Sequence, residues 1–210
     1  MNKRQKEILD RLAATYANTT SALNYTNPFE LLIAVILSAQ CTDVRVNMIT
    51  KRLFPIYATP EAFAALSQEK LEELIHDCGL FRAKAKNILA TCKILIEKFS
   101  SQVPDNMDDL ISLPGVGRKT ANVVLSQAFG VPAIAVDTHV FRVSHRLGLA
   151  KGSDVEQTEQ ELMKVIPKKD WSDAHHWLIW HGRLVCKARK PLCNKCVLVD
   201  LCKSKDKVVQ

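Results

Sequence analysis

The run of residues 113–119, Leu-Pro-Gly-Val-Gly-Arg-Lys, combines two glycines with two adjacent cations. Gly115 and Gly117 lack a Cβ atom, so they can adopt strained dihedral angles and let the backbone approach a ligand closely. The amides of such a turn, with the first turn of a following helix, form a site for an anion such as phosphate. Lys119 falls in that first helical turn, where the helix dipole disfavours a cation. The spacing therefore predicts an anionic partner for Lys119, or an amine that loses its proton easily.

Four cysteines near the end of the chain form a second group, Cys186, Cys193, Cys196 and Cys202, with the spacing C-x6-C-x2-C-x5-C. Four thiolates in so short a stretch indicate a bound metal ion or cluster. Zinc ribbons usually have two Cys-x-x-Cys pairs and this stretch has one. The spacing favours an iron-sulfur cluster only mildly and leaves zinc open. A disulfide framework is disfavoured, because seven cysteines is an odd number and no export signal accompanies them.

Asp137, in the segment Val-Asp-Thr-His at 136–139, is the third candidate for chemistry. A lysine amine attacks a sugar or carbonyl carbon only when it is neutral, and the helix start and the adjacent Arg118 favour that form of Lys119. Asp137 can accept a proton or stabilise a developing cation. Two plainer interpretations stay open, an N-cap for Asp137 and a simple phosphate contact for Lys119.

Capping residues and apolar spacing divide the chain into helices, with no convincing period-2 strand, and predict an all-α fold. The expected helices cover 27–40, a segment from Asp43, a segment from Thr59, 67–79, 81–99, 107–112, 118–129, a segment after Asp137, 153–167 with a Ser153–Glu156 capping box, and 172–186. The helix over 81–99 is amphipathic, and the residues expected on its inner face are Ile88, Leu89, Cys92, Leu95 and Ile96. We expect Cys41, Cys78 and Cys92 to be packing residues within helices.

The segment 107–129, a short helix, a glycine turn and a second helix, resembles the helix-hairpin-helix element of DNA-binding proteins. Such an element grips the sugar-phosphate backbone through turn amides and reads no base sequence. An ordinary αα-hairpin is the plainer alternative. The string Pro-Gly-Val-Gly-Arg-Lys favours the phosphate-binding interpretation.

Composition fits a globular protein of 210 residues, with 47% hydrophobic and 24% charged residues. The net charge of +7 favours polyanionic partners, without requiring them. The N-terminal segment is charged and amphipathic, and the most apolar run, 31–39, is too short to cross a bilayer. We therefore expect no signal peptide and no membrane span, and reduced cysteines in a cytoplasmic protein.

The sequence closely resembles the endonuclease III family of bacterial DNA glycosylases and abasic-site lyases over nearly its whole length. The matching motifs are Asn27-Pro-Phe-Glu-Leu-Leu32, Leu37-Ser-Ala-Gln40, Leu113–Val124, Ala135-Val-Asp-Thr-His139 and the four cysteines. The resemblance implies a 4Fe-4S cluster on those cysteines, in the segment 186–202. It also implies two helical domains flanking a DNA groove. One spans 22–132 and carries the helix-hairpin-helix, and the other joins 1–21 to 133–210 and holds the cluster.

Carried over residue by residue, the resemblance gives Lys119 as the Schiff-base nucleophile and Asp137 as its catalytic carboxylate. Gln40 and Leu80 fall where the family inserts side chains into the gap left by an extruded base. Without the resemblance, core packing is the expected role of Leu80 and a solvated helix end that of Gln40. The further residues expected to contact DNA are Gly115, Gly117, Arg118, His139, Lys187, Arg189 and Lys190.

These features together predict a base-excision-repair glycosylase that removes oxidised or ring-damaged pyrimidines from duplex DNA and cuts the strand by β-elimination. Two alternatives are a monofunctional glycosylase of the adenine type and a non-catalytic protein that binds abasic DNA. The adenine-specific relatives lack a lysine at the position of Lys119, which disfavours the first. We expect a monomer, cytoplasmic and associated with the bacterial nucleoid, with no membrane partner.

Overall fold

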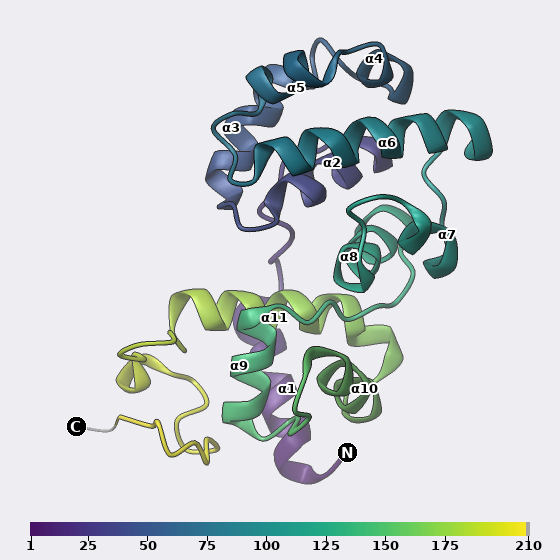
Figure 1. The fold of residues 1–210 in the computed structure, drawn as a ribbon. Helices are drawn as coiled ribbons and strands as arrows, with labels where there is room; N and C mark the ends of the chain where they lie inside the picture. The colour runs from purple at the N-terminus through teal and green to yellow at the C-terminus, as the bar shows by residue number, and fades with distance from the viewer. Residues whose placement is uncertain (209–210) are drawn as a thin grey trace. The chain divides into compact units, whose positions relative to one another are not determined.

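The computed structural model describes residues 1–208, which contain helices and loops and no strand (Figure 1). The predicted all-α class is confirmed. The α-helices are α1 (Lys3–Tyr16), α2 (Pro28–Ser38), α3 (Asp43–Leu53), α4 (Pro60–Ala64), α5 (Gln68–Leu74), α6 (Phe81–Phe99), α7 (Met107–Ser112), α8 (Arg118–Phe129), α9 (Thr138–Leu147), α10 (Val155–Val165) and α11 (Trp171–Leu184). Two short 3-10 turns, η1 (Lys168–Asp170) and η2 (Cys193–Lys195), complete the list.

Contacts between Cα atoms divide the chain into two compact units. Unit 1 joins Met1–Thr20 to Pro132–Gln210, and unit 2 is the continuous segment Ser21–Val131. Each unit has its own cluster of buried apolar side chains.

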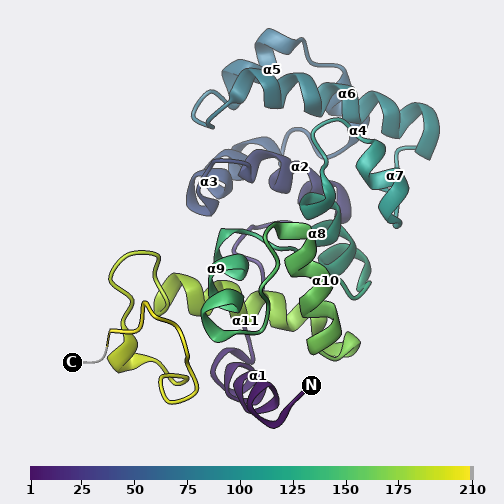
Figure 2. The same ribbon diagram turned by 60° about the horizontal axis from the view of Figure 1, so that its bottom comes forward.

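Unit 2 is built around α2, whose residues from Phe29 to Leu37 are all buried. A helix that is apolar on every side needs neighbours on every side. Helices α3, α6 and α8 pack on α2, while α4 and α5 pack on α6 (Figure 2). The amphipathic pattern places Ile88, Cys92 and Leu95 of α6 in this core, and each is fully buried.

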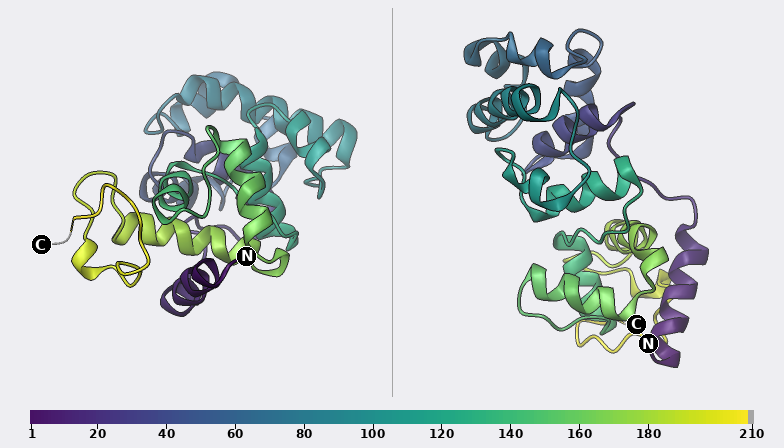
Figure 3. Two further views of the ribbon diagram at one scale, coloured as in Figure 1. Left: turned by 90° about the horizontal axis from the view of Figure 1, so that it is seen from below. Right: turned by 90° about the vertical axis from the view of Figure 1, so that its right-hand side faces the viewer.

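Unit 1 is built around α11, against which both α1 and α9 pack. Helix α1 buries Ile8, Leu9, Leu12 and Tyr16, so the first part of the chain completes the core of the last part. Figure 3 shows α1 in purple beside the green and yellow elements of the same unit. In the described part of the chain, no helix combines the length and apolarity that a bilayer span requires.

The predicted bounds of α6, α7 and α8 agree with the structure, because each is set by a turn residue or a cap. Other predictions are wrong in detail. Helix α2 ends at Ser38 and not at Gln40, and α11 runs from Trp171 to Leu184 and not from 172 to 186. Thr42, not Asp43, caps α3, and Asp154, not Ser153, caps α10. Helix α5 ends at Leu74, five residues before Gly79, because Ile75 leaves the helical conformation with φ −113° and ψ 14°.

Two of the predicted packing cysteines do not lie in helices. Cys41 follows the end of α2 and Cys78 lies between α5 and α6. Cys78 is buried and Cys41 is half-buried, and only Cys92 is a helical core residue. Ile96, expected on the inner face of α6, is 36% exposed. The buried residues of α6 also include Lys84 and Thr91, which the apolar pattern did not indicate.

Candidate functional site

The glycine turn of unit 2 lies between α7 and α8, as predicted. Gly115 adopts the left-handed conformation with φ +78°, and a Cβ atom there would lie 2.9 Å from Nδ2 of Asn87 on α6. Gly117 differs from the expectation of strained dihedral angles, since its φ is −94°. A Cβ atom at Gly117 would meet nothing within 4 Å. Gly115 therefore allows the left-handed backbone and the close approach to Asn87, while Gly117 leaves open space at the surface of the turn.

The start of α8 presents amides and cations at the surface. Gly117 is the N-cap of α8 and has no side chain, so the first amides of the helix find no hydrogen-bond acceptor on a capping side chain. Arg118 and Lys119 are exposed in this first turn. The hydroxyl of Thr91 on α6 donates to the carbonyl of Pro114 at 2.9 Å and ties the turn to the body of unit 2. The arrangement suits a bound anion.

Gln40 and Leu80 lie on two turns of unit 2 that touch each other. Both residues have left-handed backbone conformations, with φ values of 52° and 59°. A Cβ atom at Gly79 would lie 3.1 Å from the carbonyl oxygen of Gln40. Gln40 is exposed, and Leu80 is 57% exposed. Leu80 therefore does not pack in the core, which is the role that the residue type alone suggested.

Asp137 belongs to unit 1, where it is the N-cap of α9. Its Oδ1 accepts from the amides of His139 and Val140 at 2.8 Å each, and its Oδ2 lies 3.2 Å from Nδ1 of His139. Burial disfavours the ionised form, but the Val140 amide, His139 and His175 outweigh burial and hold the pKa of Asp137 below its ordinary value. The cap interpretation is thus correct, and the carboxylate is also ionised near neutral pH.

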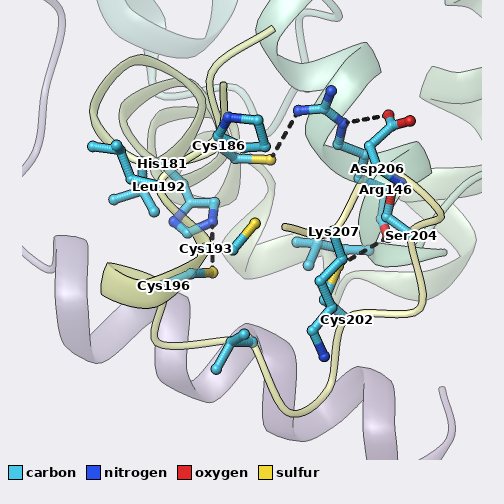
Figure 4. Close-up of a pocket in the computed structure, with 14 residues that line it drawn as sticks. Arg146, His181, Cys186, Leu192, Cys193, Cys196, Cys202, Ser204, Asp206 and Lys207 are labelled. Carbon is cyan, nitrogen blue, oxygen red and sulfur yellow. Dashed lines mark hydrogen bonds and ion pairs between the residues drawn. The ribbon is translucent and has the colours of Figure 1, made fainter. Parts of the chain in front are cut away.

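The four predicted metal ligands meet in unit 1. Cys186, Cys193, Cys196 and Cys202 line one pocket, together with apolar side chains such as Leu147 and Leu192 (Figure 4). Among residues 1–208, no three His, Cys, Asp or Glu side chains are arranged around a single metal ion.

Nitrogen donors face three of these sulfur atoms. The amides of Val208 and Leu198 lie 3.4 Å from Sγ of Cys193 and Cys196, and Nη1 of Arg146 lies 3.6 Å from Sγ of Cys186. Donors aimed at sulfur are typical of thiolates that ligate an iron-sulfur cluster. The donor set and the shared cavity therefore fit a four-iron cluster.

Around the cysteines lie residues that the sequence did not indicate. His181 is fully buried on α11, with Nε2 3.5 Å from Sγ of Cys196 and Nδ1 3.0 Å from the hydroxyl of Tyr16. Burial lowers the pKa of His181 to about 4, so the ring is neutral at physiological pH. A thiolate accepts from Nε2–H, which leaves Nδ1 to accept from Tyr16. Hydrogen bonds then link Tyr16 of α1 to His181, and His181 to Cys196.

Arg146 and Arg142 of α9 hold the loop that begins at Cys186. Arg146 donates to the carbonyls of Lys187 and Ala188 at 2.7 and 3.2 Å, and pairs with Asp206 at 3.0 Å. Arg142 donates to the carbonyl of Cys186 at 3.1 Å. The i, i+4 spacing of the two arginines is the sequence signal that places them on one face of α9.

The predicted basic residues of that loop are all exposed, namely Lys187, Arg189 and Lys190. Their backbone is held by α9 and their side chains reach solvent, which suits contact with phosphates. The predicted site residues thus fall into two groups. Unit 2 contains Gln40, Leu80 and the glycine turn with Lys119, and unit 1 contains Asp137, His139, the cysteines and the basic loop.

Comparison with known proteins gives a consistent family. Residues 33–168 match the model of the HhH-GPD superfamily of base excision DNA repair proteins, and residues 186–202 match the iron-sulfur binding domain of endonuclease III. The chain is 53% identical to endonuclease III of Escherichia coli strain K12 over 209 residues, with 99% of each chain covered. It is 54% identical to the Haemophilus influenzae protein, also over 209 residues and 99% of each chain.

Solved structures agree. An endonuclease III–DNA complex trapped as a covalent intermediate superposes with a TM-score of 0.91 at 53% identity, covering 97% of both chains. A non-covalent endonuclease III–DNA complex superposes with a TM-score of 0.92, covering 97% of this chain and 96% of the other. With these matches over nearly its full length, the chain belongs to the endonuclease III family and carries its 4Fe-4S cluster domain.

Proposed function

We propose that Lys119 is the nucleophile and Asp137 the partner carboxylate of a bifunctional enzyme, a DNA glycosylase and abasic-site lyase of base excision repair. The glycosylase and lyase activities follow from membership of the endonuclease III family. The assignment of the residues depends chiefly on one observation. Lys119 lies exposed in the first turn of α8, directly after the open, uncapped turn at Gly117.

Backbone contacts bring the DNA sugar to Lys119. The glycine turn and the first amides of α8 hold a phosphate of the damaged strand, and Arg118 adds charge beside it. In unit 1, the loop of Lys187, Arg189 and Lys190 contacts further phosphates. Cys186, Cys193, Cys196 and Cys202 would hold the 4Fe-4S cluster, and their ligation would fix the loop that carries the basic residues. His139 contacts DNA near Asp137.

Gln40 and Leu80 occupy the gap that remains when the damaged nucleotide leaves the base stack. The sugar C1′ is inaccessible inside a duplex, so the nucleotide must be extruded before Lys119 can reach it. The exposed side chain of Leu80 and the closeness of the preceding Gly79 to the Gln40 carbonyl support this role. An apolar side chain that is 57% exposed in the free protein gains apolar burial in such a gap.

The reaction then takes place at C1′. The neutral amine of Lys119 forms a bond to C1′ as the bond from C1′ to the base breaks. The electron pair leaves on the base, which takes up a proton, and the new C1′–N group loses one. Asp137 stabilises the positive charge that develops on the sugar. The sugar ring opens to an imine with Lys119, loss of a C2′ proton breaks the C3′–O bond, and the strand is cut 3′ to the lesion. Hydrolysis of the imine frees Lys119.

Borohydride trapping on a duplex with one thymine glycol tests the nucleophile. Borohydride reduces the imine to a stable amine, so the wild-type protein is expected to form a covalent adduct. Lys119→Gln is expected to form none, while Arg118→Gln keeps the nucleophile and still forms it. An adduct with Lys119→Gln would show that another amine attacks. Base release without adduct or strand cleavage in the wild type would support a monofunctional enzyme instead.

The substrate class and setting are part of the proposal. We expect damaged pyrimidines such as thymine glycol to be released far faster than adenine opposite an oxidised guanine. We also expect a cytoplasmic monomer that works on the bacterial nucleoid, since one chain supplies every proposed site residue. Light scattering of the protein with and without abasic DNA checks the stoichiometry, for which we expect one chain per lesion.

A further inference from the structure

Lys84 is a lysine in the core of unit 2, with only 4% of its surface exposed. Its Nζ lies 2.8 Å from the carbonyl oxygen of Leu37 and 3.0 Å from Sγ of Cys78. The Cys78 thiol itself donates to the same carbonyl at 3.1 Å. Burial of a lysine amine is costly unless hydrogen bonds replace water, so this position has a specific requirement for the side chain.

The acceptor of Lys84 lies in the last turn of α2. Carbonyls there have no donor within their own helix and carry the negative end of the helix dipole. The neighbouring carbonyls are also bonded, since Ser38 Oγ donates to Val35 at 2.8 Å and the Cys41 amide donates to Ser38 at 3.1 Å. Lys84 therefore supplies a positive charge and a hydrogen-bond donor at the C-terminal end of α2. Its acceptor, Leu37, lies three residues before Gln40.

Lys84 also lies next to the second turn, which its side chain reaches through Cys78. Its backbone amide donates to the carbonyl of Leu80 at 3.1 Å, which is the first hydrogen bond of α6. Through Cys78, its side chain is connected to the residue directly before Gly79. One lysine thus binds both turns, the one that carries Gln40 and the one that carries Leu80.

Both turns need such support. Gln40 and Leu80 have left-handed conformations, which are sterically unfavourable for a residue with a Cβ atom. Such conformations persist only where surrounding contacts fix them. A Cβ atom at Gly79 would lie 3.1 Å from the Gln40 carbonyl oxygen, so the two turns are close enough for a shift of one to affect the other.

We infer that Lys84 is a positioning residue, which fixes the Gln40 and Leu80 turns in the geometry that enters the DNA gap. The inference depends on the roles proposed above for Gln40 and Leu80. Lys84 itself contacts no DNA, because it is buried. Its removal impairs the reaction on duplex DNA, where a gap must be filled, and spares the reaction on a single strand, where none exists.

The test compares Lys84→Met with Lys93→Met on abasic-site oligonucleotides. Methionine keeps the length and apolar volume of the lysine stem and removes the donor and the charge. Lys93 is exposed and lies nine residues further along α6, on the opposite face. We expect Lys84→Met to lower kcat/KM for lyase cleavage of the duplex about 10-fold, and to leave the rate on the single-stranded oligonucleotide within about 2-fold. Lys93→Met is expected to change neither rate.

An equal loss of kcat/KM on the duplex and on the single strand, from misfolding or any other cause, would overturn the positioning role. An unchanged kcat/KM on the duplex would overturn it too. Lys84→Gln, which keeps a donor but no charge, is a second variant and is expected to fall between wild type and Lys84→Met. Visible absorbance of the cluster and helical circular dichroism report the fold of every variant.

A double-mutant cycle separates this inference from the function on which it depends. If Lys84 acts through the turns, Lys84→Met lowers the duplex rate less in a Leu80→Ala background than in the wild type. Fully additive effects would overturn the inference. If Gln40→Ala and Leu80→Ala leave the duplex rate unchanged, the gap-filling roles themselves are wrong, whatever Lys84→Met does.

Discussion

Asp137 caps α9, and the proposed function gives the same side chain a chemical role. One carboxylate oxygen accepts two amide hydrogen bonds of α9, and the other faces His139. A neutral amide can replace the first interaction, because asparagine caps helices as well as aspartate does. A neutral amide cannot replace the negative charge that the proposed reaction needs beside the developing sugar cation. The two roles are therefore separable by one substitution.

Asp137→Asn is expected to lower glycosylase and lyase rates about 100-fold or more and to leave the free energy of unfolding at pH 7 within about 1 kcal/mol of wild type. The pKa of Asp137 is lowered in the folded state, so its ionisation stabilises the fold above the unfolded pKa, and that contribution is lost as pH falls through the folded pKa. As the pH falls from about 5 to about 3, the wild type is therefore expected to lose stability relative to the Asn variant. Urea unfolding at each pH measures it, and an equal activity in both proteins would remove Asp137 from the mechanism.

Leu80 and Lys84 show what residue type alone does not predict. A leucine after a glycine is expected in the core and a lysine on the surface, yet Leu80 is exposed and Lys84 is buried. Burial of one side chain is decided by distant partners, here the carbonyl of Leu37 and the thiol of Cys78. The resemblance to a family predicted the role of Leu80, but no local pattern predicted the position of Lys84.

At the scale of elements, the hairpin between α7 and α8 uses its two glycines differently. Gly115 has the left-handed backbone and close packing against Asn87, while Gly117 has an extended backbone beside open space. The sequence predicted the turn that contains both glycines and the bounds of the two helices beside it. It did not separate their roles, because φ depends on how the turn is closed.

Alanine substitutions separate the two glycines. Gly115→Ala is expected to reduce the free energy of unfolding by about 1–2 kcal/mol or more, from the left-handed conformation and the contact with Asn87. Gly117→Ala is expected to cost less than about 1 kcal/mol, as an N-cap change, and to weaken DNA binding through a methyl group at the phosphate contact. Thermal unfolding and fluorescence anisotropy with abasic-analogue DNA measure the two effects. The reverse pattern would contradict the proposed phosphate site.

Helix bounds were predictable where one residue ended or began a helix without competition. Gly130 ends α8 with φ 64°, and Asn106 caps α7, as their residue types indicate. The prediction failed at Ser153–Asp154, where two capping residues are adjacent and the carboxylate takes the position. It also failed at Leu74, since no glycine or proline marks the end of α5.

At the scale of the whole molecule, the net charge of +7 favours attraction to a polyanion such as DNA and carries no information on the fold. Part of that charge lies on the loop that Arg146 holds beside the cluster. Phosphate contacts release counterions, so each contact contributes about 0.9 to the slope of log affinity against log salt.

Lys187→Gln with Lys190→Gln is expected to lower the magnitude of that slope by about 2. The control is Lys6→Gln with Lys164→Gln, which removes the same charge from exposed positions of α1 and α10. We expect the control to leave the slope nearly unchanged. Equal slopes for the two double variants would mean that general charge, and not the basic loop, attracts the DNA. Anisotropy titrations over a range of salt concentrations give both slopes.

Loss of the cluster is expected to affect unit 1 selectively. Cys196→Ser is expected to reduce bound iron, to speed trypsin cleavage at Lys187 and Arg189, and to weaken DNA binding. Cys41→Ser, which changes a thiol of unit 2, is expected to retain full iron. Iron assay and mass spectrometry of the digest measure these effects. Weakened binding without faster cleavage would indicate that the cluster does more than hold the loop.

The division of unit 1 between the two ends of the chain has a consequence for biosynthesis. Helix α1 is made first, but its apolar residues and the hydroxyl of Tyr16 find their partners only when α11 has been made. Unit 2 is continuous and can complete its core while the ribosome is still translating residues beyond 131. The nascent protein therefore completes the hairpin of α7 and α8 early, and the apolar face of α1 stays without its partner helix until α11 has been made.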